Sequence, residues 1–208
     1  HLDHTKDMDI IKAAIDAGFQ SVMIDASQKS FEDNIAITRE VVEYAHAKNV
    51  EVEAELGKIG ATDKIETDND ESLYTDPAEA EEFVAKTGVD TLAVSIGTAH
   101  GVYPVKNPKI DLERLAQIRK RVSIPLVLHG GSGLPPETVQ AAITIPGGGV
   151  SKINIATDLE QAFLGSLGCQ RKTNREIWQM DEKALAEAAE AVQRVVEDKI
   201  KNFLLWKG

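Results

Sequence analysis

Residues 124–133 read IPLVLHGGSG, an apolar run that ends in a histidine and a glycine-rich turn. The run is nearly continuous in Ile, Leu and Val, which is typical of a parallel strand covered on both faces. Four further runs have the same character. They are residues 19–25 (FQSVMID), 50–56 (VEVEAEL), 91–96 (TLAVSI) and 150–155 (VSKINI).

Amphipathic stretches with clear helix ends separate these runs. Asp76 can cap a helix that has Pro77 at its first position and Gly88 after its last turn. Asp111 and Thr157 are expected to start further helices in the same way. Strands alternating with helices indicate βαβ units and a parallel α/β sheet.

The number of strands leaves two architectures open. The sequence has five full strands, plus the tail of a sixth if residues 1–4 (HLDH) form one. A closed (β/α)₈ barrel needs eight strands and typically about 250 residues. The chain is therefore either an open doubly wound sheet or a barrel whose first two or so βα units are absent from this chain.

Composition restricts the class of protein and its partners. A chain of 208 residues, 42% of them hydrophobic, fits one domain over residues 1–208. The formal net charge of −11 disfavours nucleic acid and anionic membranes as partners. A single cysteine and the lack of a long apolar run lead us to expect a cytoplasmic protein.

Polar and glycine residues follow the predicted strands at their C-terminal edges. Parallel α/β folds bind ligands at that edge, so these segments are expected to converge on one face. They are residues 3–4 (DH), 25–27 (DAS), 53–57 (EAELG), 97–101 (GTAHG), 129–133 (HGGSG) and 154–157 (NIAT).

His4, His100 and His129 come from three different strand ends. Neutral imidazoles on separate rigid elements can bind Zn²⁺ and leave one coordination position open, as a catalytic zinc requires. Each histidine taken alone is better explained as a hydrogen-bonded core or loop residue than as a metal ligand. Their convergence beside glycines favours a zinc site.

Asp3 directly precedes His4. An acid beside a metal can exchange a proton with a substrate hydroxyl, and the alternative is a carboxylate that orients a histidine ligand. Glu53 and Glu55 share one face of their strand. Either could serve a second metal or hydrogen-bonding site, or pair with a nearby lysine.

The HGGSG and NIATD segments bring small residues and backbone N–H groups to the start of a helix. Such groups bind phosphate, and in barrels the last two strand ends are the usual place. The sequence therefore predicts a phosphate site beside the proposed metal.

Seven segments, taken in order, resemble the class II, zinc-dependent ketose-bisphosphate aldolases, the family of fructose-bisphosphate and tagatose-bisphosphate aldolases. The resemblance runs from the first residue to about Phe163 and more loosely beyond it. The segments are HLDH (1–4), SVMIDAS (21–27), VEAELGKIG (52–60), YTDP (74–77), LAVSIGTAHG (92–101), PLVLHGGSG (125–133) and KINIATD (152–158).

The resemblance implies a TIM (β/α)₈ barrel that lacks its N-terminal two or so βα units. It implies a lyase of carbohydrate metabolism, such as glycolysis, that reversibly cleaves fructose- or tagatose-1,6-bisphosphate to dihydroxyacetone phosphate and glyceraldehyde 3-phosphate. It also implies a cytoplasmic homodimer or homotetramer that uses Zn²⁺ and a monovalent cation, Na⁺ or K⁺. Another phosphorylated ketose as the substrate, a TIM-barrel zinc hydrolase and a sugar-phosphate binding module remain alternatives.

The family's functional residues fall on matching positions of this chain. Asp3 is implied as the catalytic acid, and a second metal position is implied at Asp25 and Glu55. The zinc ligands fall on His4, His100 and His129. The contacts to dihydroxyacetone phosphate fall on Gly101, Gly130, Gly131, Ser132, Asn154, Ile155, Ala156 and Thr157.

Three regions depart from the family pattern, and one of them is a loop lengthened by a few residues at 145–149 (IPGGG). Residues 61–64 read ATDK, where the family usually has two glycines and an acidic pair, so Asp63 is the nearest candidate for the loop acid. The basic segment that often contacts the distal phosphate is missing, and Arg171, Lys172 and Arg175 are the nearby cations. The sequence alone does not choose between the sugars.

Overall fold

The computed structural model describes residues 1–61, 73–103 and 108–206. Its main sheet has six parallel strands in the order β1-β2-β3-β5-β7-β8. No helix in these ranges is long and apolar enough to cross a membrane. The strands are β1 (Leu2–Thr5), β2 (Ser21–Ile24), β3 (Glu51–Leu56), β5 (Thr91–Val94), β7 (Leu126–Leu128) and β8 (Val150–Ile153).

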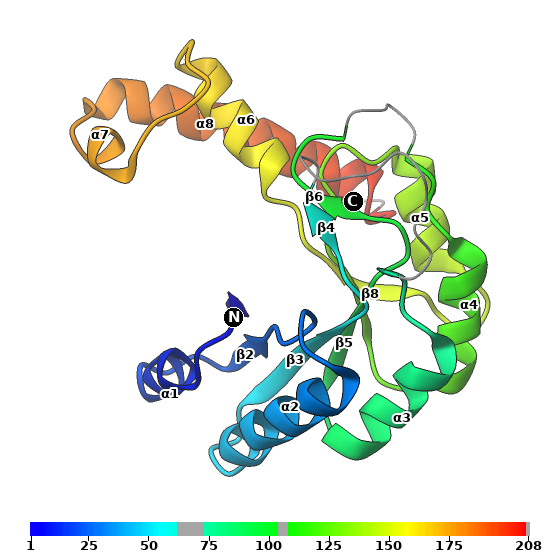
Figure 1. Ribbon diagram of the computed structural model, residues 1–208. Helices are drawn as coiled ribbons and strands as arrows, with labels where there is room; N and C mark the ends of the chain where they lie inside the picture. Colours follow the sequence, from blue (N-terminus) through cyan, green and yellow to red (C-terminus); the bar gives the residue numbers. More distant parts are fainter. Residues whose placement is uncertain (62–72, 104–107, 207–208) are drawn as a thin grey trace.

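The strand order decides between the two architectures. A doubly wound sheet reverses its order at a switch point and carries helices on both faces. Here the order follows the chain without reversal, and four helices lie along the outside of a curved sheet (Figure 1). They are α2 (Phe31–His46), α3 (Pro77–Thr87), α4 (Leu112–Arg121) and α5 (Pro136–Thr144). The fold is therefore a barrel-type α/β arc, as the resemblance implies.

The helices alternate with the strands as predicted. Asp76 caps α3 by accepting from the N–H groups of Ala78 and Glu79, and Gly88 ends it at φ 68°. Asp111 caps α4 by accepting from Arg114 N–H. The helices are α1 (Met8–Asp16), α2 (Phe31–His46), α3 (Pro77–Thr87), α4 (Leu112–Arg121), α5 (Pro136–Thr144), α6 (Thr157–Ser166), α7 (Asn174–Trp178) and α8 (Glu182–Asn202).

The start of α6 corrects one prediction. Thr157 is the first helical residue rather than the cap, and Ala156 before it offers no side-chain hydrogen bond. The Ser132 hydroxyl accepts from Asp158 N–H at 3.2 Å instead. A cap supplied by a neighbouring loop is invisible to local sequence rules, which consider only the residues beside the helix.

The hydrophobic core fills the space between the sheet and the outer helices. Leu92 and Leu126 on the strands are fully buried, as are Phe83 on α3 and Leu115 and Ile118 on α4. Burying a side chain of this size contributes roughly 1.5–3 kcal/mol. The core thus fixes the strands whose C-terminal ends carry the polar residues.

Two very short strands lie outside the main sheet. β4 (Gly60–Ala61) pairs in parallel with β6 (Ala99–His100). Neither strand is predicted from the sequence, because two residues are too few to show a period. The pairing holds the segment of His100 above the C-terminal end of the sheet (Figure 1).

Candidate active site

The structure brings His4, His100 and His129 together at the C-terminal ends of the strands. Each offers one ring nitrogen, and the three nitrogens lie within 4.8 Å of one another. The ring of His4 is 4.9 Å from that of His100 and 4.5 Å from that of His129, centroid to centroid. Three separate segments of the chain therefore meet at one point.

A β-bulge in β1 directs His4 and Asp3 toward this point. Leu2 pairs with Val22 and Thr5 with Ile24, so β1 has one more residue than β2 over this span. His4 takes up the extra residue at φ 46°, a left-handed conformation that is uncommon for residues other than glycine. In a regular strand, adjacent side chains point to opposite faces, and the bulge relaxes that constraint.

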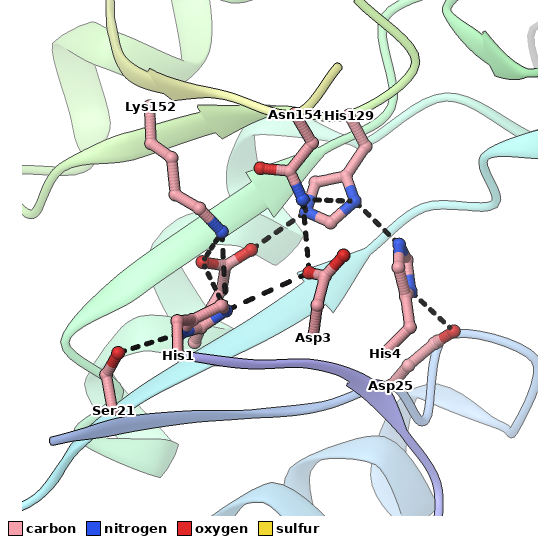
Figure 2. Close-up of polar contacts among 9 residues, drawn as sticks. His1, Asp3, His4, Ser21, Asp25, His129, Lys152 and Asn154 are labelled. Carbon is pink, nitrogen blue, oxygen red and sulfur yellow. Dashed lines mark hydrogen bonds and ion pairs between the residues drawn. The ribbon is translucent and has the colours of Figure 1, made fainter. Parts of the chain in front are cut away.

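Carboxylates orient two of the three histidines. His129 Nε2 donates to Glu53 Oε1 at 2.8 Å, and His4 Nδ1 lies 3.3 Å from Asp25 Oδ2 (Figure 2). Ionised carboxylates only accept hydrogen bonds, so each ring commits its N–H to the acid. The remaining nitrogens, His129 Nδ1 and His4 Nε2, face each other at 2.7 Å.

This arrangement fits a bound cation. Two acceptor nitrogens that face each other need a proton or a cation between them, and a carboxylate behind each histidine is the usual support of a metal ligand. Burial and the nearby rings of His4 and His129 lower the pKa of His100 to about 4, so its ring is neutral at neutral pH. The hydrogen bond with Asp25 raises the pKa of His4, so a cation that binds its second nitrogen would displace a proton. Three imidazole rings from separate segments are then a suitable donor set for zinc.

Glu53 forms a hydrogen bond with His129 and belongs to a polar network that extends to β8. Its other carboxylate oxygen binds Lys152 Nζ at 2.7 Å, and its side chain is only 3% exposed. Burial opposes its ionisation, but the hydrogen bonds from His129 and Lys152 outweigh burial and lower the pKa of Glu53. A glutamate of β3 paired with a lysine is one of the alternatives that the sequence leaves open, and the structure confirms it for Glu53. The sequence does not single out Lys152 itself, whose only signal is a cation within an apolar strand.

A second group of ligand atoms comprises His4, Asp25 and Glu55, also within 4.8 Å of one another. Burial would raise the pKa of Asp25, but hydrogen bonds from His4 and Ser27 hold it well below its usual range. Burial and the charge of Asp25 raise the pKa of Glu55 to about 7. Glu55 Oε2 is buried without a hydrogen-bond partner in the described structure, so it is available to a cation.

Asp3 lies beside the three histidines. Asn154 Nδ2 donates to Asp3 Oδ1 at 3.1 Å, which links β1 to the segment after β8 (Figure 2). The Asp3 side chain is 48% exposed, so it remains accessible to a ligand. His1, to which the sequence assigns no role, forms a hydrogen bond of 2.8 Å with Ser21 Oγ.

A pocket of about 190 Å³ opens beside these residues. Gly131 and Ile155, which the sequence analysis places with the phosphate contacts, are not part of its lining, and Gly131 N–H is already donated to the Asn154 carbonyl at 3.0 Å. The lining consists of Asp3, His4, His100, Gly101, His129, Gly130, Ser132, Asn154, Ala156 and Thr157.

Backbone N–H groups at the start of α6 suit an anion in this pocket. Within the described ranges, the N–H groups of Ser132, Ala156 and Thr157 form no hydrogen bond to the protein. Helix N-termini carry partial positive charge and bind phosphate.

The predicted loop acid, Asp63, lies outside the described residues.

Tyr103 joins two of the loops around the pocket, and the sequence analysis does not single it out. Its hydroxyl accepts from Ala99 N–H at 2.8 Å and donates to the Gly130 carbonyl at 2.9 Å. Burial raises the pKa of Tyr103 to about 12, so the hydroxyl stays protonated.

Comparison with known proteins assigns nearly the whole chain to one family. The family model described as fructose-bisphosphate aldolase class-II matches residues 1–205. The chain belongs to the class II fructose-bisphosphate aldolase family. This is a family of lyases, so the expectation of an aldolase-type enzyme is confirmed at the level of the family.

Solved structures of aldolases have a similar fold. The YdjI aldolase of Escherichia coli K12 is 39% identical, with a TM-score of 0.78 over 97% of this chain. A proposed fructose-1,6-biphosphate aldolase of Coccidioides immitis is 35% identical, with a TM-score of 0.74 over 95%. The fructose-bisphosphate aldolase of Campylobacter jejuni is 25% identical, with a TM-score of 0.68 over 92%.

The chain spans about two thirds of the length of these aldolases. The matched share of their chains is 67%, 69% and 63% in the same order.

Proposed function

We propose that this chain carries the active site of a zinc-dependent aldolase. The reaction is the reversible cleavage of a ketose 1,6-bisphosphate, fructose- or tagatose-1,6-bisphosphate, to dihydroxyacetone phosphate and glyceraldehyde 3-phosphate. The observation that carries this proposal is the meeting of three histidine nitrogens within 4.8 Å beside an accessible carboxylate and a pocket. Membership of the class II aldolase family supports it.

His4, His100 and His129 would hold the zinc ion. Zinc in this position supplies a Lewis acid that polarises the carbonyl and hydroxyl oxygens of the ketose. Asp25 and Glu53 keep the rings of His4 and His129 turned so that one nitrogen of each faces the site. Asp25 and Glu55 form the proposed second metal position, supported by the unpartnered Glu55 Oε2.

Asp3 would transfer the proton of the reacting hydroxyl. It takes the proton from the C4 hydroxyl as the C3–C4 bond breaks, and the bonding electron pair stays on C3 of the three-carbon half. C3 then takes up a proton to give dihydroxyacetone phosphate, and the condensation direction reverses both proton transfers. The hydrogen bond from Asn154 holds the carboxylate at the pocket. The same amide group lines the pocket and would contact an oxygen of the three-carbon product.

The phosphate of the dihydroxyacetone phosphate half would bind at the start of α6. The N–H groups of Ser132, Ala156 and Thr157 supply donors without adding positive side chains. Gly101 and Gly130 line the same pocket, where the lack of a side chain leaves room for the ligand. A monovalent cation, Na⁺ or K⁺, beside these loops would offset the charge of the phosphate.

Product analysis on the complete protein tests the proposal. The zinc-loaded protein is incubated separately with fructose- and tagatose-1,6-bisphosphate, and triose phosphates and inorganic phosphate are measured. We expect dihydroxyacetone phosphate and glyceraldehyde 3-phosphate in equal amounts from at least one sugar. Release of inorganic phosphate without triose phosphates would indicate a zinc hydrolase, and binding without turnover would indicate a sugar-phosphate binding module.

A further inference from the structure

We propose that Tyr103 is a positioning residue that clasps together the two loops carrying His100 and His129. The inference rests on the proposed function in one respect, namely that these two histidines bind the metal. It assigns a role to a side chain that contacts neither the proposed metal nor the proposed substrate.

The hydroxyl of Tyr103 bridges the backbones of both loops at once. It accepts from Ala99 N–H, the residue before His100, at 2.8 Å. It donates to the carbonyl of Gly130, the residue after His129, at 2.9 Å. Each end of the clasp is therefore one residue from a proposed metal ligand.

The two loops are in direct contact at the point where Tyr103 bridges them. A Cβ atom placed on Gly130 would lie 2.4 Å from the Ala99 carbonyl oxygen. Gly130 also has φ 69°, which other residues adopt only at a cost. Such a close approach of the two backbones requires a glycine at position 130. The Tyr103 hydroxyl forms hydrogen bonds with the Ala99 N–H and the Gly130 carbonyl, which the close approach would otherwise bury without partners.

The tyrosine ring is itself held in place, so the hydroxyl is a fixed point rather than a mobile contact. The ring packs against the hydrophobic core and faces Gly133, where an added Cβ would lie 3.6 Å from Tyr103 Cδ2. Gly133 N–H is in turn fixed by Asp158 Oδ2 at 3.1 Å. The clasp thus connects the segment of His100 to the whole glycine-rich loop.

Loss of the hydroxyl should loosen the spacing of His100 and His129 without removing either ligand. Supporting groups one step behind a metal ligand typically change metal affinity by about 10–100-fold. The N–H group of Ser132, which belongs to the same loop and is proposed to bind the phosphate, should also become less well ordered. Weaker binding of zinc and of the phosphorylated substrate is therefore expected together.

Tyr103→Phe in the complete protein tests the clasp, since it keeps the ring and removes only the hydroxyl. The zinc dissociation constant is measured by competition with a chromogenic chelator, and KM and kcat are measured on the zinc-saturated protein. We expect the zinc dissociation constant and KM each to rise roughly tenfold, with a smaller change in kcat. The Co²⁺-substituted variant should also show an altered visible absorption spectrum.

Tyr44→Phe is the matched control. Tyr44 lies on α2, where Lys12 and Lys48 lie over its ring, away from the pocket. It should leave zinc affinity, KM and the Co²⁺ spectrum unchanged. A Tyr103→Phe variant that is less stable but has the zinc affinity and KM of the unmodified protein would overturn the proposal, because Tyr103 would then be merely structural.

Hydrogen exchange in the unmodified protein gives a second test, which does not depend on whether the variant folds. We expect the Ala99 amide to exchange slowly, and exchange at the rate of an unprotected amide would overturn the clasp. The two proposals fail separately. Lack of aldol cleavage with weakened zinc binding in Tyr103→Phe would contradict only the proposed function, whereas normal cleavage with unchanged zinc affinity and KM would contradict only the clasp.

Discussion

Asn154 donates a hydrogen bond of 3.1 Å to the carboxylate of Asp3, joining residues that are 151 positions apart in the chain. Asp3 belongs to the first strand of the sheet and Asn154 follows the last, so the bond spans the opening between the two edge strands. Lys152 Nζ and His1 Nε2, at 3.3 Å, make a second contact across the same opening. The proposed acid, Asp3, is thus oriented by a residue that follows the last strand of the sheet.

Replacing Asp3 by Asn should remove most of the turnover and leave the metal in place. The amide has nearly the same shape but cannot take a proton, and general acid–base catalysis typically contributes about 10²–10⁴-fold. We expect kcat to fall by that range with zinc content unchanged, as measured by steady-state kinetics and elemental analysis. Asp9→Asn, in the first turn of α1, is the control. Normal kcat in Asp3→Asn would exclude Asp3 as the acid.

Replacing Glu53 by Gln should weaken zinc binding. The neutral amide still accepts from His129 Nε2, but it no longer makes the ring more basic and leaves Lys152 without its ion pair. We expect the zinc dissociation constant to rise roughly tenfold in chelator competition. Glu51→Gln, at the exposed start of the same strand, should have no effect. Equal zinc affinity in both variants would contradict the assigned role of Glu53.

Glu55 should make the metal-free protein less stable as pH rises. Its pKa is raised from 4.5 to about 7, so the folded state disfavours the ionised form that the unfolded chain accepts. The free energy of unfolding should therefore fall between about pH 4.5 and pH 7. Glu55→Gln should remove this decline. At pH 8 the free energy of unfolding of the variant should be higher than that of the unmodified protein by up to about 3 kcal/mol.

Urea unfolding of both metal-free proteins at pH 5 and pH 8 measures this difference. The two should be close in stability at pH 5 and diverge at pH 8. A constant difference between them at both pH values would show that Glu55 ionises normally in the folded protein.

Gly130→Ala should disrupt the site more than the strain of its positive φ angle alone would. The new methyl group would meet the Ala99 carbonyl at 2.4 Å in addition to adopting φ 69°. Gly168→Ala is the matched control, because Gly168 has φ 63° and open space around its Cβ position. The control should lower the free energy of unfolding by about 1 kcal/mol. Gly130→Ala should lower it clearly more and should also weaken zinc binding. Similar losses of unfolding free energy in both variants would contradict the tight packing of the two loops.

The sequence predicts the strands and the site segments well, because both depend on local patterns. All six predicted strand positions are found, with ends one to two residues shorter in several cases, such as Leu126–Leu128 within residues 124–129. The convergence of His4, His100 and His129 follows from the rule that parallel strands end at one edge.

The remaining features depend on contacts between distant segments. The bulge that places Asp3 and His4 arises from pairing with β2, and the cap of α6 comes from Ser132 in another loop. The roles of Lys152 and Tyr103 depend on partners 99 and 27 residues away in the chain. No local pattern specifies such partners, so the sequence analysis could not assign these residues.

The dependence of cleavage on zinc tests the central claim most directly. The complete protein is stripped of metal with a chelator and titrated with Zn²⁺, and bound zinc and cleavage of the preferred ketose bisphosphate are measured at each step. We predict no cleavage without metal and a rise in proportion to zinc bound at the three histidines. Full cleavage by the metal-free protein, or zinc binding without any gain of aldol cleavage, would contradict the account.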